Sequence, residues 1–198
     1  MKIVRANSCF EMTLLTGKKE SVRLLLGSFE GKEKLVERLK PDIILETKTD
    51  YFLKTKPEES FLISEAGEYE IKKIFVWAFT FFKEKERKNF FVVDGEKFVL
   101  CCFDTPFDLG VFKNELEEIG PIDTLFFFPQ DFSFSSKEVK KIFSDLGART
   151  MIVSNFSEPK KMEDLLRELA IKKIDRSNKI SLKKNDAHLA GKSLFILE

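Results

Sequence analysis

Short apolar runs separated by turn residues fill the first half of the chain, a pattern typical of a β-rich structure. One segment, residues 32–39, has apolar residues at helical spacing instead and ends before Pro41. Asp94-Gly95 between two apolar runs predicts a two-residue hairpin turn, and residues 67–70 fit a turn between strands. The strands expected in this half are 3–6, 10–15, 22–26, 42–45, 61–63, 74–82, 90–93 and 97–103.

The second half alternates predicted helices with predicted strands. Ser135, followed three residues later by Glu138, has the pattern of a capping box at a helix start. Helices are expected over 112–119, from 135 to about 146, and around 159–169; strands are expected over 122–128, 150–153 and 193–197. This order predicts an α/β protein with two β-sheets covered by helices on the outside, in one domain spanning residues 1–198.

Composition narrows the class of protein. The 198 residues are 43% hydrophobic and 34% charged, which indicates a globular chain that is neither disordered nor membrane-spanning. The net charge of +1 argues against nucleic acid and anionic membrane surfaces as partners. Three cysteines and no apolar leader predict a reduced, cytoplasmic protein. Two of them, Cys101 and Cys102, are expected to act as small buried hydrophobes.

Four segments resemble one known family in their order and spacing. They are residues 3–10 (IVRANSCF), 63–71 (ISEAGEYEI), 89–104 and 117–125 (EEIGPIDTL). They resemble the small metallo-β-lactamase-fold hydrolases related to bacterial ascorbate-phosphate lactonases. The resemblance implies a four-layer αββα sandwich with two mixed β-sheets and helices outside. In an active member it also implies zinc, which lowers the pKa of a bound water to make a nucleophile.

The metal-ligand positions implied by the resemblance have changed residue type. The family motif His-x-His-x-Asp-His falls on residues 48–53, and only Asp104, the metal-bridging position, keeps the family residue. The changed positions are Asn7, Lys48, Asp50, Phe52, Leu53 and Asn155. A protonated lysine repels a metal ion, and Phe and Leu cannot ligate one. We therefore expect no zinc, no other cofactor and no catalytic residue.

Two further expectations concern this former site. A hard cation held by Asp50, Asp104 and Asp108 is the alternative to a site without metal. Lys48 is expected to place its ammonium where the metal would lie and to pair with Asp104, or else with Asp50. The single histidine, His188, lies beyond the region of resemblance and is expected to be a surface residue.

The function predicted on these grounds is that of a pseudoenzyme acting as a binding or assembly module. The chain has 22 phenylalanines, an unusually high number. A/T-rich coding, an apolar interface, or both together would account for it. The expected interface residues, on one aromatic strand, are Phe75, Trp77, Phe79, Phe81 and Phe82. The partner is expected to be another protein or a second copy, as in a homo-oligomer. A hydrolase with a remodelled, non-zinc site and a nucleic-acid-binding module are the alternatives.

Overall fold

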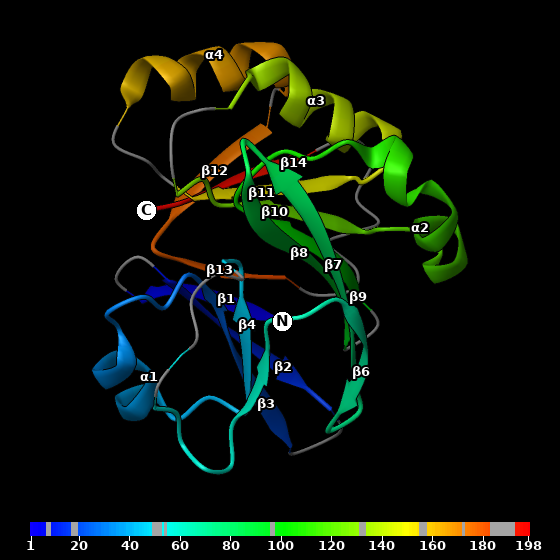
Figure 1. Cartoon of the computed structure of the whole chain (residues 1–198). Helices are drawn as coiled ribbons and strands as arrows, with labels where there is room; N and C mark the ends of the chain where they lie inside the picture. The colour runs from blue at the N-terminus through cyan, green and yellow to red at the C-terminus, as the bar shows by residue number, and fades with distance from the viewer. Residues whose placement is uncertain are drawn as a thin grey trace.

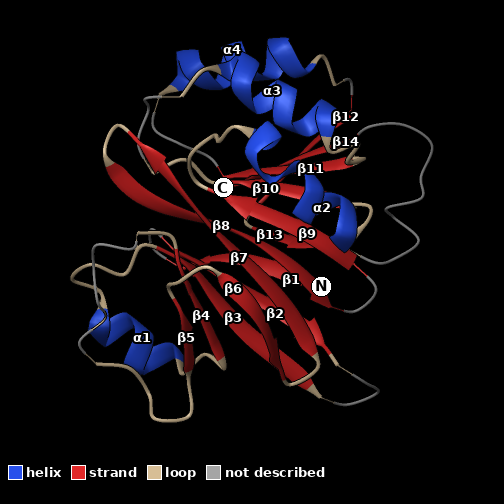
Figure 2. Ribbon diagram, turned by 45° about the vertical axis from the view of Figure 1, so that its right-hand side comes forward, coloured by secondary structure: helices blue, strands red, loops and turns tan. Residues whose placement is uncertain are grey.

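Two β-sheets lie face to face in the computed structural model, and helices cover their outer faces (Figures 1 and 2). Apolar side chains from the facing sides of both sheets form the central core, among them Met12, Leu24, Val76 and Phe91. This helix–sheet–sheet–helix order confirms the predicted αββα architecture. The structure describes residues 1–6, 9–16, 20–48, 53, 55–95, 98–130, 134–154, 158–171, 173–182 and 193–198.

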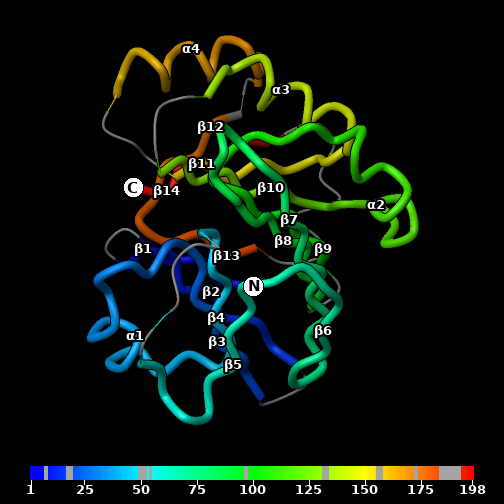
Figure 3. Tube along the Cα trace, viewed as in Figure 1, coloured from blue at the N-terminus to red at the C-terminus, as the bar shows by residue number. Residues whose placement is uncertain are grey.

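The first sheet has six strands and is built mostly from the N-terminal part of the chain. Its strands, in spatial order, are β13 (Lys179–Ser181), β1 (Lys2–Ala6), β2 (Cys9–Leu15), β3 (Ser21–Gly27), β4 (Ile43–Glu46) and β5 (Phe61–Ile63). Pairing is antiparallel from β13 to β3 and parallel from β3 to β5. Figure 3 shows β13, late in the chain, returning to lie beside β1. Helix α1 (Glu33–Leu39) covers the outer face, where Leu35 and Val36 are buried.

The second sheet has eight strands. In spatial order they are β12 (Lys173–Ser177), β14 (Ser193–Leu197), β11 (Thr150–Ser154), β10 (Thr124–Phe127), β9 (Phe98–Phe103), β8 (Glu86–Gly95), β7 (Ile74–Lys83) and β6 (Gly67–Ile71). Strands β6 to β9 are antiparallel, and the others are parallel. The helical elements of its outer layer are η1 (Leu109–Phe112), α2 (Lys113–Ile119), α3 (Ser136–Asp145) and α4 (Pro159–Leu169). No helix in the described ranges is long and apolar enough to cross a membrane.

Local sequence signals explain several of these elements. The capping box at α3 is confirmed: the Ser135 side chain accepts from the Lys137 N–H, and Glu138 accepts from the Ser135 N–H at 3.1 Å. Cys101 and Cys102 are fully buried, and they point to opposite faces of β9, into the outer and the central core respectively. Burial raises the pKa of both thiols above the ordinary value, so neither is a reactive thiolate.

One turn prediction is wrong, and a second is confirmed only in part. Residues 67–70 belong to β6, an edge strand that pairs with β7. The predicted hairpin is present, since β8 and β9 pair antiparallel, but Asp94 and Gly95 lie within β8, where Gly95 pairs with Phe98. A Cβ on Gly95 would lie 2.7 Å from the Ile74 side chain, so this glycine serves close packing between strands rather than a turn.

Candidate functional site

Buried polar residues meet between the two sheets, at the end of β4, the start of β8 and the end of β9. We call Glu46, Thr47, Asn89 and Asp104 the inter-sheet polar cluster; none of the four is more than 2% exposed. The Asn89 N–H donates to the Thr47 carbonyl at 2.9 Å. Directly beside it, Lys48 forms an isolated antiparallel bridge with Lys88. The chain leaving β4 thus crosses to β8 and links the two sheets.

Glu46 is the most perturbed acid of this cluster. Burial raises the pKa of Glu46 to about 7, and the nearby charge of Asp104 acts in the same direction. Three groups act against this rise: the backbone N–H of Lys48 at 3.0 Å, the N–H of Phe29 at 3.1 Å, and the positive charge of Lys32. Glu46 is therefore partly protonated near neutral pH.

Asn89 holds the two sheets together through its side chain. Its Nδ2 donates to the carbonyls of Glu46 at 3.0 Å and Ser64 at 2.8 Å. Its Oδ1 accepts from the Thr80 hydroxyl at 2.7 Å. The second sheet is thereby joined to the ends of β4 and β5 in the first, in a site with little access to water.

The structure brings together only part of the predicted former site. Asp104 lies in the inter-sheet polar cluster, whereas Leu53 packs into the core beneath α1. Asp108 is separate from them, because its carboxylate caps η1 by accepting from the Gly110 N–H at 3.0 Å. The positions Asn7, Asp50, Phe52 and Asn155 lie outside the described residues.

The predicted Lys48–Asp104 ion pair is not among the ion pairs between described residues, and Asp50, the alternative partner, lies outside those residues. None of the ion pairs between described residues includes the Lys48 ammonium. Its backbone N–H is instead tied to the Glu46 carboxylate, and its backbone bridges to β8. The positive charge that acts on Glu46 comes from Lys32, at the start of α1.

A second candidate surface lies on the outer face of β7. Phe75, Trp77, Phe79 and Phe81 alternate with residues of the central core and so share this face. Phe75 is 44% exposed and stacks on Trp77, with ring centroids 6.2 Å apart. Of the five expected interface residues, Trp77, Phe79 and Phe81 are half-buried, and Phe82, on the opposite face of the strand, is 75% exposed.

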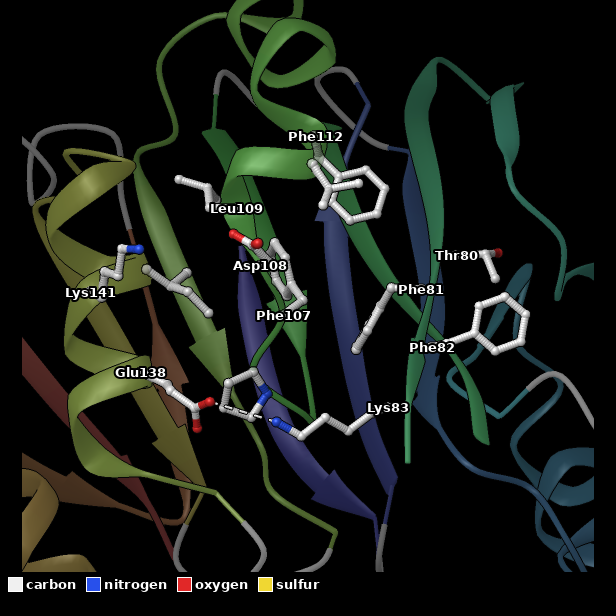
Figure 4. Close-up of a pocket in the computed structure, with 13 residues that line it drawn as sticks. Thr80, Phe81, Phe82, Lys83, Phe107, Asp108, Leu109, Phe112, Glu138 and Lys141 are labelled. Carbon is white, nitrogen blue, oxygen red and sulfur yellow. Dashed lines mark ion pairs between the residues drawn. The ribbon is translucent and has the colours of Figure 1, made fainter. Parts of the chain in front are cut away.

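Two hollows lie along this face, on either side of Phe112. The first, of about 620 Å³, is lined by Phe81, Phe107 and Phe112, and Figure 4 shows the Lys83–Glu138 ion pair at one end of it. The second, of about 520 Å³, is lined by Trp77, Phe79 and Phe112, with glutamates from β6 and α2. The aromatic face of β7 is therefore covered only in part by the helical layer.

Solved structures share this architecture. A protein from Thermotoga maritima, named as a candidate Zn-dependent hydrolase of the metallo-β-lactamase superfamily, matches with a TM-score of 0.67 and 16% identity, over 98% of this chain and 97% of that one. YhfI from Bacillus subtilis, a metallo-β-lactamase-fold protein, matches with a TM-score of 0.54 and 11% identity, over 98% of this chain and 95% of YhfI. The chain has the metallo-β-lactamase fold. A mutant of the CmlA β-hydroxylase matches with a TM-score of 0.56 and 12% identity, over 100% of this chain and 52% of the hydroxylase.

No family model matches the chain, and no curated protein matches its sequence. At these low identities the solved structures establish the metallo-β-lactamase fold alone. The narrower resemblance to the ascorbate-phosphate lactonases stays a prediction.

The described residues do not fit the zinc centre that the metallo-β-lactamase fold can hold. A zinc site needs at least three nitrogen, sulfur or oxygen ligands from the protein. In the part of the chain that the structure describes, no group of three or more His, Cys, Asp or Glu could hold a metal ion. The hydrophobic Leu53 packs into the core beneath α1 and supplies no ligand atom. Among the described acids of this cluster, Asp104 and Glu46 are two buried carboxylates, which is fewer than the three ligands a zinc site needs.

Sequence reasoning missed Glu46 and the bonding role of Asn89. One signal for Glu46 was available, since a charged residue directly follows the apolar run Ile43-Ile44-Leu45 of a buried strand. The role of Asn89 depends on carbonyls from two distant segments, and no local pattern indicates it.

Proposed function

We propose that the chain is a binding or assembly module built on the metallo-β-lactamase fold, and that it does not act as a zinc hydrolase. The observation that carries the proposal is the aromatic face of β7, where Phe75, Trp77, Phe79 and Phe81 lie in one row beneath incomplete helical cover. Aromatic side chains at a partly open surface are typical of protein interfaces.

The residue types at the former metal positions support the inactive half of this proposal. Lys48 carries a cation where the resemblance expects a histidine, and Leu53 contributes to a hydrophobic core. A single substitution could be compensated by a neighbouring ligand. The loss of every expected histidine removes the donors on which zinc hydrolysis depends.

A remodelled hydrolase is the second candidate, favoured by one observation. Glu46 has a pKa of about 7 beside a second carboxylate, Asp104, and such pairs occur at acid–base sites. Both oxygens of Glu46 accept backbone N–H groups, and Glu46 and Asp104 are 0% and 2% exposed. This geometry favours a role in holding the loop after β4 over a role in contacting substrate.

The inactive half is tested by metal content and turnover. After dialysis against Zn²⁺, Mn²⁺ or Mg²⁺, elemental analysis should find far less than one zinc per chain, and lactones and phosphodiesters should not be hydrolysed. About one zinc per chain together with turnover that depends on Asp104 would overturn the proposal.

The binding half is tested by site-specific cross-linking. A photoactivatable side chain at Phe75 should give a discrete adduct in the source cells, whether with another protein or with a second copy. The same group at Leu15, a comparably exposed apolar position at 55% on the other sheet, is the matched control. Equal or absent cross-linking at both positions, combined with a strict monomer by light scattering, would contradict the binding role.

A further inference from the structure

We infer that the second hollow beside β7 is a docking site for a cationic, partly apolar segment of a partner polypeptide. This inference rests on the proposed binding function and names the chemistry of the partner. We call the site the acidic aromatic groove; it is the hollow of about 520 Å³ between the outer face of β7 and helix α2.

The floor of the groove is aromatic. Trp77 and Phe79 belong to β7, and Phe112 directly precedes α2. Phe79 and Phe112 meet edge to face, with centroids 5.5 Å apart, and Phe75 extends the row beyond Trp77. Flat aromatic faces of this kind attract guanidinium and ammonium groups as well as aliphatic side chains.

The rim of the groove is acidic. Glu68 lines it from β6, and Glu115 and Glu118 line it from α2. Glu70 extends the acidic side, because it lies opposite Phe75 in the β6–β7 ladder, as Glu68 lies opposite Trp77, and paired residues share a face. Among the described residues that line the groove, there is no lysine, arginine or histidine.

These charges are not neutralised within the described part of the molecule. The ion pairs found there include none of Glu68, Glu70, Glu115 and Glu118. By contrast, Glu117 on the same helix pairs with Lys113 and lines a different hollow. Like charges gathered on a low-dielectric aromatic floor raise the local concentration of cations.

The two rim glutamates on α2 differ in their effect on the helix. Glu115 lies in the first turn, where negative charge is favourable, whereas Glu118 lies in the last turn, which holds no basic residue and where the helix C-terminus carries a partial negative charge. An external cation beside Glu118 would relieve this repulsion.

The dimensions favour an extended polypeptide over a single small cation. The aromatic row extends beyond the groove, from Phe75 at one end to Phe81 in the first hollow at the other, and spans roughly 20 Å at about 3.3 Å per residue. The Glu pairs on β6 and α2 lie on both sides of this row. A segment of about seven residues with alternating basic and aliphatic side chains matches both features.

Trp77 makes the inference directly testable, because it is the only tryptophan in the chain. The probe is a capped peptide of about seven residues with alternating Arg and Leu, titrated while Trp77 fluorescence is followed. Saturable change is expected, with affinity that weakens strongly when the salt is raised to about 0.5 M. A peptide with Glu in place of Arg should produce no saturable change at the same concentrations.

Charge-neutral variants locate the site. Glu68→Gln combined with Glu118→Gln should raise the Kd of the Arg/Leu peptide about tenfold at low salt, since two rim charges are lost. Glu117→Gln removes the same charge from the same helix outside the groove and should leave the Kd unchanged. Equal binding of the Arg and Glu peptides, or equal loss in both variants, would overturn the inference.

The outcome also separates this inference from the function on which it rests. If cross-linking at Phe75 succeeds but the peptides show no charge preference, the binding function stands and the cationic partner is wrong. If the covering molecule is a second copy whose association is unaffected by Glu68→Gln with Glu118→Gln, the inference is likewise overturned. Zinc-dependent turnover would instead remove the proposed function itself.

Discussion

Glu46 has surroundings unlike those of an ordinary surface carboxylate. It ends a strand whose four residues are all buried, and its two oxygens accept the N–H groups of Phe29 and Lys48. Burial and the charge of Asp104 together outweigh these donors and Lys32, and the pKa of Glu46 rises to about 7. The protonated form is thus the one that the fold favours.

The stability of the protein should therefore fall as the pH rises through the pKa of Glu46. The folded state binds this proton more tightly than the unfolded chain, whose pKa is near 4.5. The stabilising contribution of the Glu46 proton is complete below pH 4.5 and is lost as the pH rises through about 7. The free energy of unfolding should fall by an amount of order 3 kcal/mol across this range. Chemical denaturation of the wild type and of Glu46→Gln between acid and mildly alkaline pH measures the difference.

Glu46→Gln leaves one backbone N–H without its acceptor, so it should be less stable than the wild type at acid pH. That deficit should shrink or reverse at higher pH. A deficit that stays constant across the range would show that Glu46 does not titrate as described.

At the level of single elements, the β7–β8 hairpin shows strain in its turn. Lys83 pairs with Glu86, which leaves Glu84 and Lys85 as the two connecting residues, with φ of 50° and 75°. A two-residue turn with positive φ at both positions matches the right-handed twist of the strands but favours Asn and Gly. Glu84 and Lys85 therefore adopt a left-handed conformation that their side chains disfavour.

Lys85→Gly should stabilise the protein by about 1 kcal/mol, because glycine adopts the left-handed conformation without the cost that a side chain carries. Urea denaturation with an unchanged m-value is the measurement. Lys85→Ala keeps the conformational cost and should bring no such gain. A loss of stability in Lys85→Gly would argue against this turn geometry.

For the whole molecule, the inter-sheet polar cluster adds a directional link to the apolar contact between the sheets. Asn89 joins β8 to the ends of β4 and β5, and Thr80 on β7 completes its hydrogen bonding. The central core holds the sheets together by burial, which sets no exact alignment between them. The Asn89 bonds specify that alignment.

Asn89→Ala should destabilise the fold by about 2–3 kcal/mol, since the buried carbonyl of Glu46 and the part-buried carbonyl of Ser64 lose their donor. Thr80→Val, which removes only the hydroxyl bond to Asn89, should cost about 1 kcal/mol. Thermal or urea unfolding measures both. Equal small effects would mean that burial alone aligns the sheets.

Where a segment's environment is local, its sequence was a reliable guide. The Ser135–Glu138 capping box, the aromatic strand at residues 74–82 and the burial of Cys101 and Cys102 were all confirmed. Residues 67–70 and Gly95 were misassigned. β6 becomes a strand only through its ladder with β7, and Gly95 is required by the side chains of Ile74 and Leu14, which are distant in sequence.

The sequence by itself determined the layered α/β architecture, because the period of apolar residues selects strand or helix and their order selects the layers. It also predicted residue types that cannot ligate zinc at the metal positions implied by the resemblance, since ligand chemistry belongs to the side chain. Tertiary structure alone decided that the Lys48 backbone bridges to β8, that Glu46 is buried near the Asp104 carboxylate, and that glutamates with no ion pair among the described residues border the aromatic face of β7. These depend on distances between segments far apart in the chain, and burial and charge act through such distances.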